Sequence, residues 1–74
     1  MSLATAPTAT RMRITSINGN GAHAGRMMEM GIIEGAEVSV IRRAPLGDPL
    51  QIRLGDYELS LRSLQAELVD VEPI

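Results

Sequence analysis

The most informative segment of the chain is LQIRLGDYELSL, residues 50–61. Apolar and polar residues alternate on both sides of Gly55-Asp56, a pattern typical of two strands joined by a two-residue turn. The predicted register pairs Leu50 with Leu61, Ile52 with Leu59 and Leu54 with Tyr57. Arg53 then lies opposite Glu58 on the other face, where opposite charges add modest stability. We therefore predict a β-hairpin with one apolar face, which a slip of one residue would expose.

Further strands are expected on both sides of this hairpin, because glycine and proline divide the chain into short segments. The predicted strands are Met12–Ile17, Glu37–Arg43 and Glu67–Val71, with a helix at Ala22–Met30 that ends at Gly31 and one tight turn at Arg62–Ala66. Five short strands with one helix inserted after the first predict a mainly β fold, a small closed barrel. Its predicted inward residues are Ile14, Val38, Val40, Leu50, Ile52, Leu54, Leu59, Leu61, Val69 and Val71.

The first ten residues, MSLATAPTAT, carry no charge and only small or isolated apolar side chains. Such a composition gives little apolar surface to offset the entropy lost on ordering. It also lacks the basic and apolar regions of a signal peptide. We expect residues 1–10 to be a flexible leader and residues 11–74 to form the folded domain.

The composition limits the chemistry open to the chain. The 74 residues include no cysteine, no lysine and one histidine, so disulfides, thiolate zinc sites and Schiff-base catalysis are excluded. A net charge of −2 and a single aromatic residue, Tyr57, disfavour nucleic-acid binding. No apolar run approaches the roughly 20 residues that span a bilayer. We expect a cytoplasmic binding protein with no catalytic residue, no metal ligand and no cofactor.

Two segments are candidates for contacting a partner. Residues 44–49, APLGDP, form a loop that two prolines stiffen, so that Leu46 can be presented at low entropic cost. The methionines of the predicted helix are mostly core residues, but Met28 or Met27 should be partly exposed beside Arg26. The candidate partner-binding residues are Arg26, Met27, Leu46, Gly47, Asp48 and Pro49.

Several of these segments together resemble one known family. Met30-Gly31-Ile32, Gly35, the RAPLGDP segment at 43–49 and the YELSLR segment at 57–62 resemble the FeoA family, over roughly residues 11–72. Glu34 and Asp56 depart from the residues common in that family. The resemblance implies an SH3-like barrel that accompanies bacterial ferrous iron transport. It also implies a partner, the cytoplasmic GTPase domain of a FeoB-type membrane transporter, and no iron bound by the chain itself.

Other functions stay open on the sequence. One is a direct iron or zinc binder, a sensor or chaperone, in which His23 would need ligands from elsewhere in the chain. Another is an SH3-like domain related to the C-terminal domain of iron-dependent repressors. A third is a GTPase-activating factor that inserts Arg26 or Arg43. Self-association, with a second copy covering Leu46 or Met28, is also open.

Overall fold

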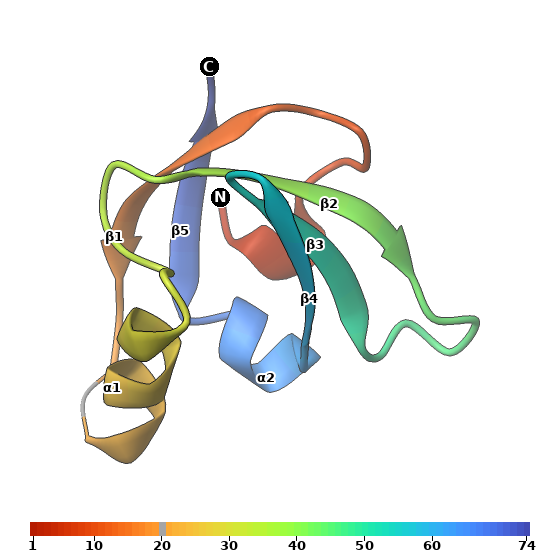
Figure 1. Cartoon of the computed structure of the whole chain (residues 1–74). Coiled ribbons are helices and arrows are strands. Elements are labelled where there is room, and N and C mark those ends of the chain that lie inside the picture. The colour runs from red at the N-terminus through yellow and green to blue at the C-terminus, as the bar shows by residue number, and fades with distance from the viewer. Residues whose placement is uncertain (20) are drawn as a thin grey trace.

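A computed structural model gives the fold for residues 1–19 and 21–74. The elements are a 3₁₀ turn η1 (Leu3–Thr5), strands β1 (Met12–Ile17), β2 (Glu37–Arg43), β3 (Leu50–Leu54), β4 (Tyr57–Leu61) and β5 (Val69–Pro73), and helices α1 (Ala22–Glu29) and α2 (Ser63–Ala66). All five strands lie in one antiparallel sheet of order β4-β3-β2-β1-β5, which curls around a single core (Figure 1). The expected mainly β architecture, with one helix after the first strand, is confirmed.

The hairpin of β3 and β4 forms in the predicted register. Its pairs are Leu50 with Leu61, Gln51 with Ser60, Ile52 with Leu59, Arg53 with Glu58 and Leu54 with Tyr57. Glu58 accepts hydrogen bonds from the Arg53 guanidinium at 2.9 Å and from the Gln51 amide at 2.8 Å. The outward face of the hairpin is therefore polar, and two donors share the Glu58 carboxylate on that face.

Of the other predicted strands, Met12–Ile17 and Glu37–Arg43 are confirmed with the same bounds, whereas the last one begins two residues late. Helix α2 continues into a further turn, in which Glu67 N–H bonds Ser63 O and Leu68 N–H bonds Gln65 O. Helical hydrogen bonding at these positions prevents them from joining the sheet, so β5 starts at Val69.

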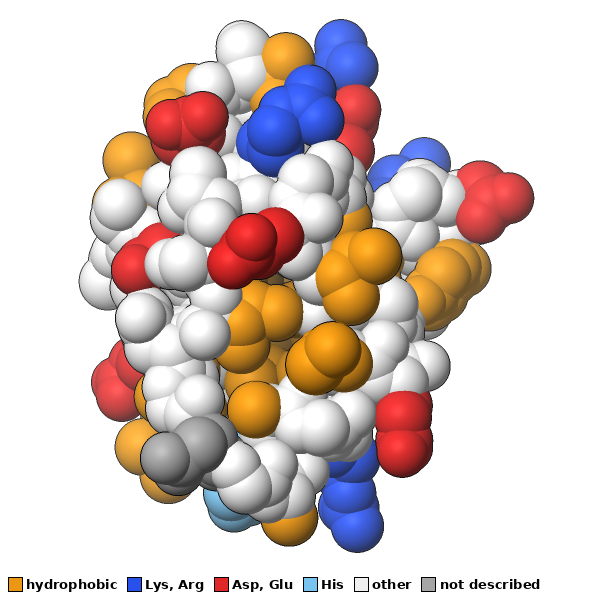
Figure 2. Space-filling view, turned by 90° about the vertical axis from the view of Figure 1, so that its left-hand side faces the viewer, with side chains coloured by type: hydrophobic (Ala, Val, Ile, Leu, Met, Phe, Trp, Pro, Cys, Tyr) orange, Lys and Arg blue, Asp and Glu red, His pale blue; other side chains and the backbone are white. Residues whose placement is uncertain are grey.

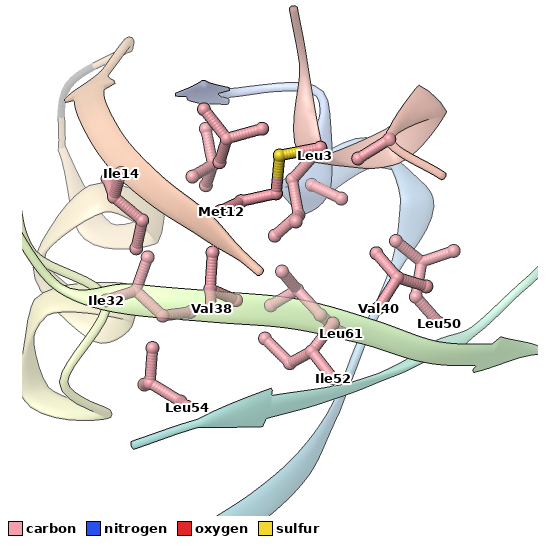
Figure 3. Packing of buried hydrophobic residues seen from close by; sticks show 14 of the residues in the cluster. Leu3, Met12, Ile14, Ile32, Val38, Val40, Leu50, Ile52, Leu54 and Leu61 are labelled. Carbon is pink, nitrogen blue, oxygen red and sulfur yellow. The ribbon is translucent and has the colours of Figure 1, made fainter. Parts of the chain in front are cut away.

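The core is aliphatic and fills the space inside the curled sheet (Figure 3). Nine of the ten predicted inward residues are buried, and Leu59 is half-buried against the same cluster. The buried residues outside that prediction are Leu3, Ala6, Met12, Met27, Ile32 and Ala66. Apart from Met12 on β1, these residues come from the first ten residues, from α1 and the turn after it, and from α2 rather than from the strands.

Residues 1–10 are not a leader outside the domain, and this corrects the expectation that structure begins near Arg11. Leu3 and Ala6 are buried in the core, at 0% and 1% exposure. Met1 O accepts a hydrogen bond from Val71 N–H on β5, and Ala9 N–H donates one to Val40 O on β2. The segment therefore runs from β5 across to β2, and we call residues 1–10 the strap.

The strap adds two bridges to the sheet, one to an end strand and one to an inner strand. In the strand order, β4 and β5 are the two end strands, so the described ladder is open where a closed barrel would pair them. Ser2 forms a bridge with Asp70 on β5, and Thr8 forms one with Val40 on β2. The expected barrel of five strands is therefore present, and α2, rather than a ladder between the end strands, connects β4 to β5.

Polar bonds tie β5 to β1 near one end of the strap. The Asp70 carboxylate accepts hydrogen bonds from Asn18 Nδ2 at 2.9 Å and Ser16 Oγ at 3.1 Å. These two bonds, that from Asn18 above all, lower the pKa of Asp70 below its ordinary value, because they favour the charged carboxylate. At neutral pH the Asp70 carboxylate is charged, and this is the form that the two hydrogen bonds stabilise.

Candidate partner-binding site

The connection from β2 to β3, residues 44–49, projects from the body of the described chain (Figure 1). Leu46 at its tip is 97% exposed, the highest value among the large hydrophobic residues. Most exposed leucines need no explanation, but one held almost wholly in water at the tip of a constrained loop is a candidate anchor for a partner. We call residues 44–49 the knob.

Short hydrogen bonds within the knob fix its shape. Gly47 N–H bonds Ala44 O at 2.7 Å and Ala44 N–H bonds Pro49 O at 3.0 Å. Gly47 adopts φ of +88°, a conformation that residues with a side chain rarely adopt, so a glycine is needed at this turn. The tip therefore has little freedom to lose when a partner covers it.

Helix α2 clamps the base of the knob from a second direction. Ser63 N–H donates to Asp48 Oδ1 at 3.0 Å, and Ser63 Oγ donates to Gly47 O at 3.2 Å. Arg62 Nη1 lies 3.8 Å from the same carboxylate oxygen. Asp48 thus satisfies an otherwise unpaired N–H at the start of a helix, as a cap does, and its carboxylate is turned toward its own chain.

The six predicted site residues do not form one cluster. Leu46, Gly47, Asp48 and Pro49 lie together in the knob, whereas α1, with its exposed Arg26, lies on the other side of the barrel (Figure 1). The prediction for Met27 is wrong: its side chain is 0% exposed and fills the core, so it offers no surface to a partner. The exposed methionine of this helix is Met28, at 58%.

The face that carries α1 has an apolar hollow of its own. Hydrophobic side chains gather at the centre of this face (Figure 2). The hollow there is lined by Ile17, Met28, Ile33 and Glu34, and both Met28 and Ile33 are exposed. It is a second apolar surface, separate from the knob.

His23, considered for metal binding, and Arg43, considered for GTPase activation, lie in different parts of the fold. His23 is exposed on α1 beside Leu64 and Leu68, and no cluster of three or more metal-ligating side chains occurs within residues 1–19 and 21–74. Arg43 is occupied, because its Nη2 donates to the strap carbonyls of Ala4 at 2.9 Å and Ala6 at 2.7 Å. The Arg43 side chain therefore holds the strap against β2 and is not an exposed arginine.

The clamp from α2 and one pocket beside the knob were missed by the sequence reasoning. The pocket, of about 200 Å³, is lined by Arg42, Arg43, Ala44, Pro45, Pro49, Gln51 and Ser60. Asp48 and Ser63 are fifteen residues apart and share no periodic pattern, so no local signal joins them. The predicted hairpin register does pair Gln51 with Ser60, and that pairing could have placed two of the seven lining residues side by side.

Across the described part of the chain, no helix is both long and apolar enough to span a membrane.

Comparison with known proteins identifies the family. The sequence profile of the FeoA domain matches residues 1–73, strap included. A fusion of Fe(2+) transport protein A with the Fe(2+) transporter FeoB from Porphyromonas gingivalis is 39% identical over 61 residues, which are 82% of this chain and 7% of that protein. This chain thus spans a small part of the curated relative that it matches.

Solved structures show the same fold. The solution structure of iron(II) transport protein A from Clostridium thermocellum superposes with a TM-score of 0.96 at 30% identity, covering 100% of this chain and 46% of that one. The crystal structure of Stenotrophomonas maltophilia FeoA complexed with zinc, described as a prokaryotic SH3 domain protein, gives 0.83 at 32% identity, covering 97% of this chain and 89% of that one.

A more distant likeness concerns the fold alone. The manganese regulator SloR superposes with a TM-score of 0.85 at 14% identity, over 99% of this chain and 34% of that one. The barrel is therefore an SH3-like fold that also occurs in metal-dependent regulators. With the profile covering nearly every residue, the chain belongs to the FeoA family, which its sequence resembles.

Proposed function

We propose that this chain is a non-enzymatic accessory protein that binds the cytoplasmic GTPase part of a FeoB-type ferrous iron transporter, with the knob as its contact. The observation that carries the proposal is Leu46, 97% exposed on a loop held by its own hydrogen bonds and by α2. A leucine kept in water by a rigid support gains free energy when a partner covers it and loses little entropy.

The choice of partner rests on the fusion relative. In the Porphyromonas gingivalis protein, a segment 39% identical to this chain is joined covalently to a FeoB transporter. Such a fusion holds the two parts at high effective concentration, which is useful where they work together. We extend that association to this chain, and we place the contact on the cytoplasmic side of the membrane.

The experiment compares two exposed apolar residues on opposite sides of the barrel. Leu46→Asp should keep the free energy of unfolding within about 0.5 kcal/mol, because the side chain is in water. It should weaken binding to the detergent-purified transporter of the same organism at least about thirtyfold, as measured by calorimetry. Met28→Asp, on α1, should leave the affinity unchanged.

Unchanged affinity of a folded Leu46→Asp variant would remove the knob from the interface. Loss of binding in Met28→Asp alone would instead move the contact to the hollow on α1. Since a parallel substitution of an exposed apolar residue serves as the control, a general loss of solubility cannot imitate the expected result.

Direct metal binding is the second candidate, favoured by the zinc complex of the Stenotrophomonas maltophilia relative. The donor set of this chain does not fit a resident site: it has one histidine and no cysteine, and its described residues bring no three ligating side chains together. Anaerobic titration with Fe²⁺ or Zn²⁺ while following thermal unfolding decides, since a specific site must raise the melting temperature with metal concentration.

A further inference from the structure

Beside the knob lies a pocket that the proposed contact with Leu46 does not use. Arg42, Gln51 and Ser60 are side by side on β2, β3 and β4, since Arg42 pairs with Gln51 and Gln51 pairs with Ser60. Ala44, Pro45 and Pro49 of the knob form an apolar wall next to this row. The pocket therefore combines a polar floor with one side of the knob.

The charge of this pocket is not balanced within the chain. Two of the residues that line it are arginines and none of the described lining residues is acidic. Glu58 on the same sheet face is engaged by Arg53 and Gln51, and Asp48 is engaged by Ser63 N–H and Arg62. Arg42 is exposed and forms no ion pair with any residue of 1–19 or 21–74.

The available donors define the group that fits. An arginine offers up to five N–H donors and no acceptor, and the Ser60 hydroxyl can donate as well. The Gln51 amide nitrogen already donates to Glu58. Positively charged donors without competing negative charge suit an anionic acceptor, and among unmodified protein side chains the carboxylate of Asp or Glu is that group.

The volume of the pocket indicates whether a free ligand or a single protein side chain fits it. Sites for nucleotides or other free ligands of that size usually enclose about 300–1,000 Å³, whereas this one measures about 200 Å³. A single Asp or Glu side chain fits it. Because Ala44, Pro45 and Pro49 belong both to the pocket wall and to the knob, a protein that covers Leu46 also reaches Arg42.

We infer that Arg42, with Ser60, is the docking site for a carboxylate on the protein segment that covers Leu46, so that the partner surface joins an apolar pocket to an acidic group. This inference rests on the proposed function and names the chemistry of its partner. A charge at the rim of an interface acts mainly on the association rate and on its salt dependence, and it excludes surfaces of the wrong charge.

The test measures binding kinetics of the whole chain with the detergent-purified transporter at two or more salt concentrations. Arg42→Ala should lower the affinity about tenfold, mostly through the association rate, and should flatten its dependence on salt. Arg42→Glu should weaken binding further. Arg13→Ala serves as the matched control, because Arg13 is an exposed arginine on β1 whose register partners are Glu37 at the start of β2 and Glu72 on β5, and it should bind as the unaltered chain does.

Two outcomes separate this inference from the function on which it rests. If Leu46→Asp abolishes binding while Arg42→Ala leaves the rate, the affinity and the salt dependence unchanged, the carboxylate site is overturned and the proposed function stands. If the unaltered chain does not bind the transporter at all, both are overturned. Equal losses in Arg42→Ala and Arg13→Ala would also overturn the site, since they would reflect net charge alone.

Discussion

Asp48 shows how a single residue of the candidate site can have a structural role beside the predicted one. The sequence places it in the knob, and it is one of the predicted partner-binding residues. In the structure its Oδ1 accepts a hydrogen bond from Ser63 N–H at 3.0 Å and faces Arg62 at 3.8 Å. Asp48 therefore positions Leu46 by fixing the base of the knob to α2, and Ser63 is its partner in that role.

The distinction between positioning and contact can be tested at Asp48 itself. Asp48→Asn keeps a carbonyl oxygen that can accept from Ser63 N–H, whereas Asp48→Ala removes it. We expect Asp48→Ala to lower the free energy of unfolding by about 1 kcal/mol, as the loss of a helix cap does, and Asp48→Asn to cost less than half of that. Urea unfolding followed by circular dichroism gives both values.

The binding affinity completes this test of Asp48. Affinity for the transporter should follow stability, with Asp48→Asn close to the unaltered chain. If Asp48→Asn loses affinity as strongly as Asp48→Ala while remaining as stable as the unaltered chain, the carboxylate charge itself contacts the partner and the positioning role is wrong.

The end of α1 depends on the residues that follow the helix and on the core. Gly31, predicted to stop the helix in a left-handed conformation, has φ of +94°. Its N–H bonds Met28 O at 3.0 Å, and Ile32 N–H bonds Met27 O at 3.0 Å, so the last carbonyls of the helix are satisfied. Met27 and Ile32 are both fully buried, and their packing anchors the end of α1 to the core.

Two glycines of this region should respond in opposite ways to alanine. A Cβ on Gly31 would lie 2.7 Å from Tyr57 Oη at a positive φ, so Gly31→Ala should destabilise the fold by about 1–3 kcal/mol. Gly25 lies within α1 with nothing inside 4 Å of a Cβ, and Gly25→Ala should stabilise it by about 0.5–1 kcal/mol. Thermal unfolding of the two variants checks the signs. Equal effects would mean that the end of α1 is not held as described.

Elements with a strong local pattern were predicted well from the sequence, and those held by distant contacts were not. The hairpin register follows from alternation on both sides of Gly55-Asp56, and its pairs are those predicted. The strap has one isolated leucine, Leu3, in a run of small residues, and it is ordered through Val71 and Val40, far along the chain. No sequence pattern within ten residues of Leu3 indicates those contacts.

The features of the candidate site also fall into those that the local sequence predicts and those that depend on distant contacts. Pro45, Gly47 and Pro49 predict a stiff connection from their own backbone preferences, and the knob is such a connection. The clamp by Ser63 and the row of Arg42, Gln51 and Ser60 depend on how α2 and three strands meet, which is a property of the tertiary structure.

At the scale of the whole molecule, the strap is part of the fold. Leu3→Ala removes most of a fully buried leucine side chain, so it should lower the free energy of unfolding by about 2–5 kcal/mol. Leu64→Ala, at a leucine that is 76% exposed, should change it by no more than about 0.5 kcal/mol. Chemical denaturation measures both. A Leu3→Ala variant as stable as Leu64→Ala would show that residues 1–10 do not pack as described.

The barrel carries apolar surface on two opposite sides, the knob with Leu46 and the hollow with Met28, and the account assigns the transporter to the knob. The most direct test follows the methyl signals of selectively labelled leucine and methionine by NMR while the purified transporter is added. Binding through the knob predicts that the Leu46 methyl signals shift or broaden at ratios that leave the Met28 signal unchanged. Perturbation of Met28 with Leu46 unchanged, or of neither, would contradict it.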